Sequence, residues 1–303
     1  MERGCSISQR STYDCLARLF SDTNILINVK SLIAQSLGCA SYGGNMHNHN
    51  LLDVLRNVAN QYPKDMVDEQ VRDIPRISFN IGIALDAAKP KPCRDLELCD
   101  LGGGIGLFTI GCAAYGLKRT VLVDDFNDPV NHSIGVSILD LHRCLGVEVI
   151  ARDVVENGIR DIAGAFDIIT TFDSMEHWHH SPKKLFHEVV EKLKPGGVFI
   201  LGVPNSKNLN KRLTALLGIG KWSNMQDWYE ADKFRGHVRE PDVNDLIYIA
   251  RDMGLTAIKI RGRNWLGYSS KNPVTRVATK IMDYPLMLKP SLCSDIYMVG
   301  RKV

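Results

Sequence analysis

Asp100-Leu101-Gly102-Gly103-Gly104-Ile105-Gly106 is the stretch that decides the fold of this chain. It lies between a short apolar run at 96–99 and a longer apolar run at 107–115. The first run predicts a strand and the second a helix, joined by a tight turn. Glycines in such a turn let the backbone approach a ligand that a Cβ atom would push away. The stretch therefore predicts the first half of a nucleotide-type site.

The glycine spacing distinguishes between two kinds of ligand. Turns that bind dinucleotides carry Gly-x-Gly-x-x-Gly, in which the last glycine permits close packing beside a pyrophosphate. Here the third glycine position holds Leu107 when counted from Gly102 and Thr109 when counted from Gly104. An acidic residue, Asp100, enters the turn where a phosphate would be repelled. The turn therefore favours a neutral or cationic ligand.

Apolar runs that read as strands alternate with helical patterns along the rest of the chain. The expected strands are 96–100, 120–124, 147–151, 167–171, 198–203, 256–260 and a last one at 295–302. Such alternation predicts an α/β fold with a mostly parallel sheet and helices on both faces. Ligands of such sheets bind beyond the carboxyl ends of the strands.

Five elements stand in the order typical of one enzyme family. They are the glycine turn, a strand that ends on Asp124, the segment Ala151-Arg152-Asp153-Val154, the strand and loop at 166–177, and the turn Leu193-Lys194-Pro195-Gly196-Gly197. With them the chain resembles the class I, Rossmann-like, S-adenosylmethionine-dependent methyltransferases, in particular the small-molecule branch that includes quinone-biosynthesis enzymes. The resemblance covers residues 95–254 and the last strand. It implies a seven-stranded Rossmann-like sheet with helices on both faces and an antiparallel last strand.

The resemblance also implies which residues bind S-adenosylmethionine. Asp124 would accept hydrogen bonds from both ribose hydroxyls, with Asp125 as the competing residue. Asp153 would lie near the adenine amino group. The expected cofactor-binding set is Asp100, Gly102, Gly103, Gly104, Gly106, Asp124, Asp153, Val154 and Thr171.

Two histidines are the candidates for contact with the methyl acceptor. His177 follows the fourth expected strand, and His237 lies in a loop similar to a substrate-side loop of the family. Each is expected to act as a base, to orient the acceptor, or to make structural hydrogen bonds in its loop. No metal is expected, because His177, His179 and His180 are too closely spaced to serve one tetrahedral ion.

The tryptophans leave two roles open. Trp178, Trp222, Trp228 and Trp265 either line an aromatic acceptor pocket or pack in the core.

Composition and charge place limits on the function. Of the 303 residues, 45% are hydrophobic and 23% charged, as in ordinary globular proteins. No stretch reads as a transmembrane helix or a secretory signal, and the eight cysteines form no Cys-x-x-Cys pair, so the cytoplasm is the expected location. Residues 205–303 carry 17 Lys and Arg against 9 Asp and Glu, a balance of +8. This favours an anionic or glycosyl-linked acceptor and leaves contact with a membrane surface open, while no nucleic-acid module is visible.

The domain organisation follows from the same patterns. Residues 1–92 are expected to form an N-terminal helical cap and linker, and 93–303 the cofactor-binding core. A lid-like insertion is expected at about 261–293, with a short helix at 273–283 whose apolar face contains Val274, Val277, Ala278, Ile281 and Met282. The oligomeric state is left open.

The sequence therefore predicts a methyltransferase that acts on a small molecule, most readily at oxygen. Two alternatives remain: an NAD-dependent oxidoreductase on a related sheet, and a non-catalytic protein that binds S-adenosylmethionine.

Overall fold

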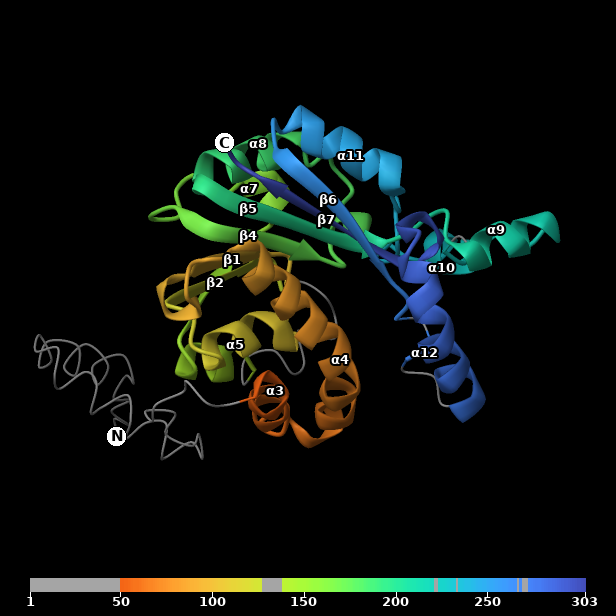
Figure 1. Ribbon diagram of the computed structural model, residues 1–303, viewed down its shortest axis with the longest axis horizontal. Helices are drawn as coiled ribbons and strands as arrows, with labels where there is room; N and C mark the ends of the chain where they lie inside the picture. The colour runs from red at the N-terminus through yellow and green to blue at the C-terminus, as the bar shows by residue number, and fades with distance from the viewer. Residues whose placement is uncertain (1–49, 127–137, 221–222, 233, 266, 269–271) are drawn as a thin grey trace, which may run out of the picture. The chain divides into compact units, whose positions relative to one another are not determined.

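The computed structural model describes residues 50–126, 138–220, 223–232, 234–265, 267–268 and 272–303 (Figure 1). Its centre is a seven-stranded sheet with the order β3-β2-β1-β4-β5-β7-β6. The strands are β1 (Glu97–Leu101), β2 (Arg119–Asp124), β3 (Val147–Ala151), β4 (Phe166–Phe172), β5 (Leu193–Pro204), β6 (Thr256–Arg263) and β7 (Asp295–Arg301). All of the strands expected from the sequence are present, but β5 begins at Leu193, so the segment 193–197, predicted as a turn, is assigned to this strand. Phe166 of β4 pairs with Leu193 there, which extends the sheet ahead of the expected start.

The strand directions match the predicted fold class. Strands β1 to β5 pair in parallel, whereas β7 lies between β5 and β6 and is antiparallel to both. The last strand is therefore antiparallel, as expected. The order reverses at β1, which pairs with β2 on one side and with β4 on the other. This reversal leaves a crevice beyond the carboxyl ends of β1 and β4, the usual binding site in such sheets.

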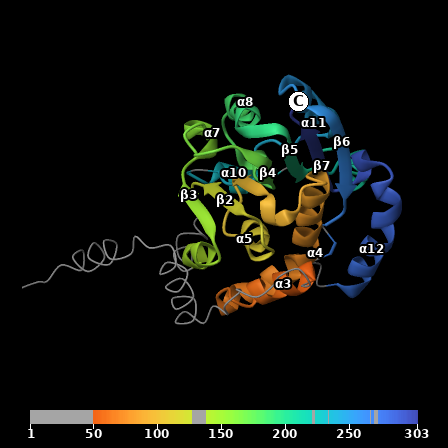
Figure 2. The same cartoon turned by 60° about the vertical axis from the view of Figure 1, so that its left-hand side comes forward.

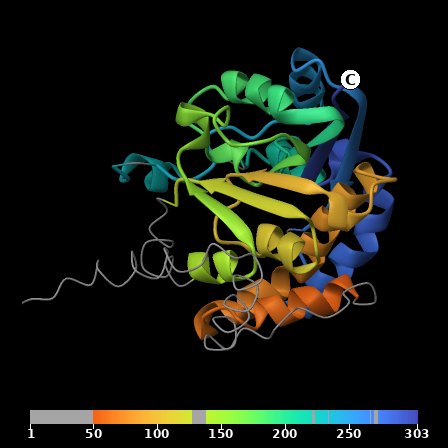
Figure 3. The ribbon, with the colours of Figure 1, turned by 90° about the vertical axis from the view of Figure 1, so that its left-hand side faces the viewer.

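Helices cover both faces of the sheet (Figures 1 to 3). One face carries α3 (Leu51–Ala59), α4 (Lys64–Ala87) and α5 (Leu107–Ala114), and the other carries α7 (Val154–Asn157), α8 (Lys183–Lys192) and α11 (Val243–Asp252). Side chains alternate between the faces along each strand, so Leu98 and Leu122 join the core under the first layer and Cys99 and Val121 join the core under the second. The predicted two-sided arrangement is confirmed.

The helices α3 and α4 share a core with the sheet. Leu55 and Ile81 pack against α5 at Gly111, where an added Cβ atom would lie 2.6 Å from Leu55 Cδ2. The Tyr62 hydroxyl donates to the carbonyl of Ile105, in the glycine turn, at 3.0 Å. The helices α3 and α4 and the short connection between them therefore pack against α5 and the glycine turn. The domain boundary expected at residue 92 stays a prediction, and the first 49 residues of the expected cap lie outside the described ones.

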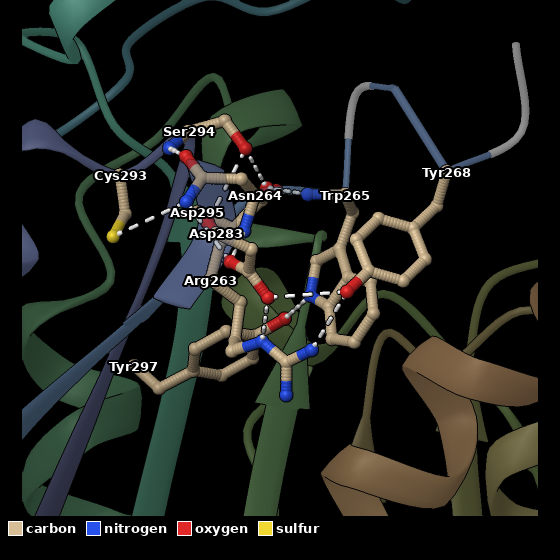
Figure 4. A network of polar contacts seen from close by, with 9 residues as sticks. All are labelled: Arg263, Asn264, Trp265, Tyr268, Asp283, Cys293, Ser294, Asp295 and Tyr297. Atoms are coloured by element: carbon tan, nitrogen blue, oxygen red, sulfur yellow. Dashed lines mark hydrogen bonds and ion pairs between the residues drawn. The ribbon is translucent and has the colours of Figure 1, made fainter. Parts of the chain in front are cut away.

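The segment between β6 and β7 carries its own helix, α12 (Pro273–Met287), followed by the short 3₁₀ helix η4 (Pro290–Leu292). A buried carboxylate, Asp283, ties this helix to the sheet by accepting hydrogen bonds from Arg263 Nε at 2.9 Å and from the Asn264 backbone N–H at 3.0 Å (Figure 4). The helix is longer than the expected 273–283, and its apolar face is largely exposed, with Val274 at 73%. No described residue of 261–293 is among the pocket-lining residues, so the lid stays a prediction.

The remaining helices are short. They include η2 (Cys93–Asp95), η3 (Met175–His177), α9 (Leu209–Leu216) and α10 (Met225–Tyr229), and residues 138–144 are also helical. Within the described part of the chain, no helix combines the length and the apolar character that a membrane span needs.

Candidate active site

A cavity of about 910 Å³ opens beyond the carboxyl ends of β1, β2, β3 and β4. Its walls come from the glycine turn, from the loops after these four strands, and from the segment around α10. The lining residues are Gly102, Gly104, Asp124, Asp125, Asp153, Val154, Val155, Glu156, Asp173, Ser174, His177, Trp178, His179, His180, Trp228, Tyr229, Ala231, Asp232, Phe234 and Arg235. Small-molecule sites occupy about 300–1,000 Å³, so this cavity has room for a cofactor together with an acceptor.

Two glycines of the turn face this cavity, and both need the left-handed backbone region. Gly102 has a φ of +70°, and a Cβ atom there would lie 1.9 Å from Ser174 Oγ. Gly104 has a φ of +57°, and an added Cβ atom would meet no protein atom within 4 Å. Because Gly104 lines the cavity, that open space is available to a ligand. Gly104 therefore permits close approach, whereas Gly102 permits the turn to pack.

A matched pair of substitutions tests the role of Gly104. We expect Gly104→Ala to weaken binding of S-adenosylhomocysteine about tenfold, because the new methyl group enters the ligand space, while backbone strain costs roughly 1–2 kcal/mol of stability. Gly254, which follows α11 with a φ of +70° and open space around it, gives the control Gly254→Ala. Calorimetric titration should show weaker binding of S-adenosylhomocysteine in Gly104→Ala and unchanged binding in Gly254→Ala. Equal affinity in the two variants would contradict the role of Gly104.

Asp124 lies at the end of β2 and closes the turn from the side. Its Oδ2 accepts the Gly104 backbone N–H at 2.9 Å and its Oδ1 accepts the Phe126 backbone N–H at 2.8 Å. A carboxylate oxygen can accept more than one hydrogen bond. Asp124 and its neighbour Asp125 both line the cavity. The structure thus places the predicted ribose-binding residue beside the glycine turn.

Asp153 occupies the corresponding position after β3. Its Oδ1 caps α7 by accepting the backbone N–H groups of Val155 at 2.8 Å and Glu156 at 3.0 Å. Val154 begins that helix, and both predicted residues line the cavity. The N-terminus of α7 therefore faces the side of the pocket where the adenine is expected.

Four other residues of the predicted cofactor set are not among the described lining residues. Asp100 is 1% exposed and accepts hydrogen bonds from the hydroxyls of Thr109 and Thr170, both at 2.7 Å. A Cβ atom at Gly103 would lie 2.1 Å from the Asp100 carboxylate, so the turn rests on this side chain. Gly106 is the N-cap of α5, and Thr171 is buried in β4. Their expected part in binding stays a prediction, and the contacts that the structure shows support the turn.

Burial raises the pKa of Asp100 to about 6, and this shift gives a pH test. The folded state holds the Asp100 proton more tightly than the unfolded state, whose pKa is near 3.8, so protonation of Asp100 stabilises the fold at low pH. This stabilisation is lost as the pH rises from about 4 to about 6. Asp100→Asn removes the titration and keeps the shape. In urea unfolding we expect its stability relative to the native protein to rise across this interval and then level off. A difference that does not change with pH would contradict the shift.

Of the two predicted histidines, His177 lines the cavity, whereas His237 is not among the described lining residues but contacts the His177 ring. Their ring centroids are 4.9 Å apart and the rings are nearly perpendicular, at 83°. His177 Nδ1 lies 2.8 Å from the carbonyl oxygen of Arg235, and His237 Nδ1 lies 2.7 Å from Glu240 Oε1. Both acceptors require a proton on Nδ1, which leaves the lone pair of each imidazole on Nε2. The structure therefore joins two residues that are sixty positions apart in the sequence.

Glu240 holds His237 in a defined orientation. Burial raises the pKa of Glu240, but the hydrogen bonds that it accepts from His237 and Lys211 outweigh burial and lower it. The carboxylate is thus ionised at neutral pH. A histidine whose Nδ1–H donates to a carboxylate has the arrangement of a general base with its orienting residue.

The sequence did not identify two acidic residues of this region, Asp173 and Glu176. Asp173 follows β4, has a φ of +49°, and forms an ion pair with Arg76 of α4. Glu176 is 1% exposed, and its Oε2 has no hydrogen-bond partner among the described residues. Burial, followed by the charge of Asp173, raises the pKa of Glu176 to about 8. The adjacent His177 was the only sequence signal near Glu176, and nothing in the sequence paired Arg76 with Asp173.

The described tryptophans fall into the two roles left open by the sequence, namely lining the pocket and packing in the core. Trp178 and Trp228 line the cavity. Trp265 instead packs in the core and donates from Nε1 to the Tyr297 hydroxyl at 2.7 Å. Trp222 lies outside the described residues.

Comparison with known proteins identifies the family of this chain. Residues 70–260 match the family model of the methyltransferase domain, and the chain belongs to this family. It is a class I S-adenosylmethionine-dependent methyltransferase, and S-adenosylmethionine is its cofactor, as the motifs predicted. Among curated proteins, none matches the sequence significantly.

Several solved structures share the fold. A putative sarcosine dimethylglycine methyltransferase from Galdieria sulphuraria is 14% identical with a TM-score of 0.49, over 84% of this chain and 98% of that one. A possible histamine N-methyltransferase from Thermotoga maritima is 15% identical with a TM-score of 0.47, over 84% and 100%. Magnesium protoporphyrin IX methyltransferase from Synechocystis, solved with bound S-adenosylhomocysteine, is 14% identical with a TM-score of 0.45, over 93% and 100%.

Proposed function

We propose that this enzyme transfers the methyl group of S-adenosylmethionine to an oxygen atom of a small-molecule acceptor held at the His177 and His237 end of the cavity. The observation that carries this proposal is the hydrogen bond between His237 and Glu240, at 2.7 Å, beside a cavity large enough for two ligands. A hydroxyl must lose its proton as it attacks, and an oriented imidazole can accept that proton. Methylation of an amine that is already neutral needs no such group.

The cofactor would lie between the glycine turn and the N-terminus of α7. In this pose Gly102 and Gly104 face the methionine part, Asp124 binds the ribose hydroxyls, and Asp153 with Val154 contacts the adenine. The sulfonium carries a positive charge, which the carboxylates of the lining stabilise. The methyl group is already activated, so the enzyme mainly aligns the acceptor with the S–CH₃ axis, and such positioning supplies up to about 7–11 kcal/mol.

The lining favours a hydroxyl-rich acceptor within the classes that the sequence suggested. Asp173 and Asp232 line the cavity and can accept hydrogen bonds from hydroxyls, whereas Arg235 is the cation of the described lining and can pair with an anionic group. A glycosyl-linked acceptor with one acidic group satisfies both features. The basic balance of residues 205–303 would attract such a molecule. Trp178 and Trp228 offer apolar faces on which a sugar ring can stack.

The pocket supports a small-molecule acceptor as the partner. From the sequence we further propose no nucleic-acid partner and a cytoplasmic location, with contact to a membrane surface left open.

A product-release assay tests the proposal. The purified enzyme would be incubated with S-adenosylmethionine and acceptors that differ in one group: glycosides with and without a carboxylate, phenols, and amines. We expect S-adenosylhomocysteine to form with hydroxylated acceptors, and mass spectrometry with NMR to place the new methyl group on oxygen. Methylation of amines or carbon alone would refute the oxygen assignment. Cofactor binding without turnover of any acceptor would favour the non-catalytic alternative.

A further inference from the structure

We propose that Glu176, His177 and His237 bind a divalent transition-metal ion, with Zn²⁺ as the best-fitting ion, at the acceptor end of the cavity. One carboxylate oxygen and one ring nitrogen of each histidine lie within 4.8 Å of one another. Two imidazoles and a carboxylate are a ligand set that zinc uses in catalytic sites, where the fourth position stays open. This set differs from the group His177, His179 and His180, whose spacing in the sequence argued against a metal.

The buried carboxylate is the independent observation that points to a ligand. Glu176 is 1% exposed, and its Oε2 has no hydrogen-bond partner within the described part of the chain. A buried carboxyl oxygen without a hydrogen-bond partner costs free energy whether the group is ionised or protonated, and natural proteins usually pair such groups or use them to coordinate metals. The backbone carbonyl of the same residue accepts the Val238 N–H at 2.7 Å, so the His237 loop is held against it. An ion between Glu176 and this loop would supply the missing partner.

The hydrogen bonds of His177 and His237 fix the ring nitrogen that is left to bind an ion. A metal-binding histidine commonly donates its other ring N–H to a carbonyl or a carboxylate, which fixes the tautomer. His177 does so with the carbonyl of Arg235, and His237 does so with Glu240. Each Nε2 therefore keeps the lone pair that an ion needs.

The spacing requires only a small adjustment. Bonds of about 2.0–2.1 Å in a tetrahedral site place ligand atoms roughly 3.3 Å apart, so the three side chains must close by about an ångström or more. His237 lies on an exposed loop with its side chain 38% exposed, and its movement disturbs little packing. Asp173 and Glu240 add negative charge near the site, while Arg76 and Lys211 pair with them.

The inference rests on the proposed function in one respect. His177 lines the cavity, so an open coordination position beside it would take an oxygen of the acceptor. With the ion bound, the Nε2 lone pairs would be taken by the metal, and the ion would acidify the acceptor hydroxyl in place of the His237 imidazole, so loss of His237 would lower the rate in either arrangement.

Metal titration of the full chain tests the inference. The protein would be stripped with a chelator and titrated with Zn²⁺ by calorimetry and with Co²⁺ by visible absorption, which responds to the ligand set. We expect one equivalent per chain and binding at least about 100-fold weaker in Glu176→Gln and His237→Ala. Glu240→Gln should weaken binding about 10–100-fold, because it orients His237. His187→Ala, whose side chain lies on α8 and is not among the described lining residues, should bind as the native protein does.

The outcomes separate this inference from the proposed function. Fewer than about 0.1 equivalents of metal, or equal binding in Glu176→Gln and His237→Ala, would overturn the metal site. A loss in His187→Ala equal to that in His237→Ala would do the same, because metal binding would then not depend on this cluster. S-adenosylhomocysteine would be titrated into the stripped protein in parallel. Its binding checks that each variant is folded, and failure of that binding in the native protein would count against the methyltransferase assignment alone.

Discussion

Replacement of His237 by alanine should lower kcat by about 10²–10⁴-fold, the contribution typical of a group that takes a proton in the transition state. Affinity for S-adenosylhomocysteine should stay within about threefold, because His237 lies at the acceptor end of the site and not among the cofactor residues. Rates of S-adenosylhomocysteine release with a productive acceptor would provide the measurement. The same variant should retain its fold, since the His237 side chain is partly exposed.

Two further variants make this result specific. Glu240→Gln keeps the shape of the side chain and removes its charge, so kcat should fall by a smaller factor and KM should change little. His187→Ala is the matched control, because His187 lies on α8 near Asp252 and is not among the described lining residues. A rate within about threefold of the native enzyme in His237→Ala would contradict its role in the reaction.

Asp124→Ala should weaken binding of S-adenosylhomocysteine by about 100-fold. A hydrogen bond to a charged group contributes roughly 1.5–3 kcal/mol, and the ribose offers two hydroxyls to this carboxylate. The variant also releases the backbone N–H groups of Gly104 and Phe126, which Asp124 now holds. Calorimetric titration measures the loss, and thermal unfolding checks that the fold persists.

Asp125→Ala is the natural control for this experiment. Both aspartates line the cavity, and the sequence left Asp125 as the competitor for the ribose. We expect Asp125→Ala to change the affinity by less than about fivefold. If Asp125→Ala causes the larger loss, the two residues exchange roles, and if neither variant changes affinity, the ribose lies elsewhere.

The fold was predictable because its signals are local. Each buried parallel strand is a short apolar run, and the polar residues that follow such runs, Asp124 and Asp153, reach the same edge of the sheet by topology alone. The absence of Gly-x-Gly-x-x-Gly spacing also argued against a dinucleotide as the cofactor. The assignment of strands, cofactor and family therefore needed little beyond order and spacing.

The acceptor end was less predictable because its contacts connect distant segments. Arg76 and Asp173 are 97 residues apart, and His177 meets the carbonyl of Arg235 across 58 residues. The periodic spacing of apolar residues in the sequence does not predict contacts between such distant polar residues. Glu176 was overlooked for a different reason: a glutamate beside histidines in a polar loop reads as exposed, and only the packing of the His237 loop against it explains its burial.

The helix α12 illustrates a limit of periodicity. The apolar residues Val274, Val277 and Ile281 do recur at helical spacing, and the helix is present, yet this face is exposed. Spacing predicts the helix itself, whereas burial depends on what lies opposite. Here the helix is anchored through Asp283 and its polar contacts with Arg263 and Asn264.

The central claim is that the cavity beyond β1 and β2 binds a sulfonium nucleoside, and competitive calorimetry on the full chain tests it most directly. S-adenosylmethionine and S-adenosylhomocysteine should each bind with one site per chain, the Asp124→Ala variant should lose this binding, and NAD should not compete. Binding of NAD with no heat from S-adenosylmethionine, or equal affinity for S-adenosylmethionine in the native protein and in Asp124→Ala, would contradict the account.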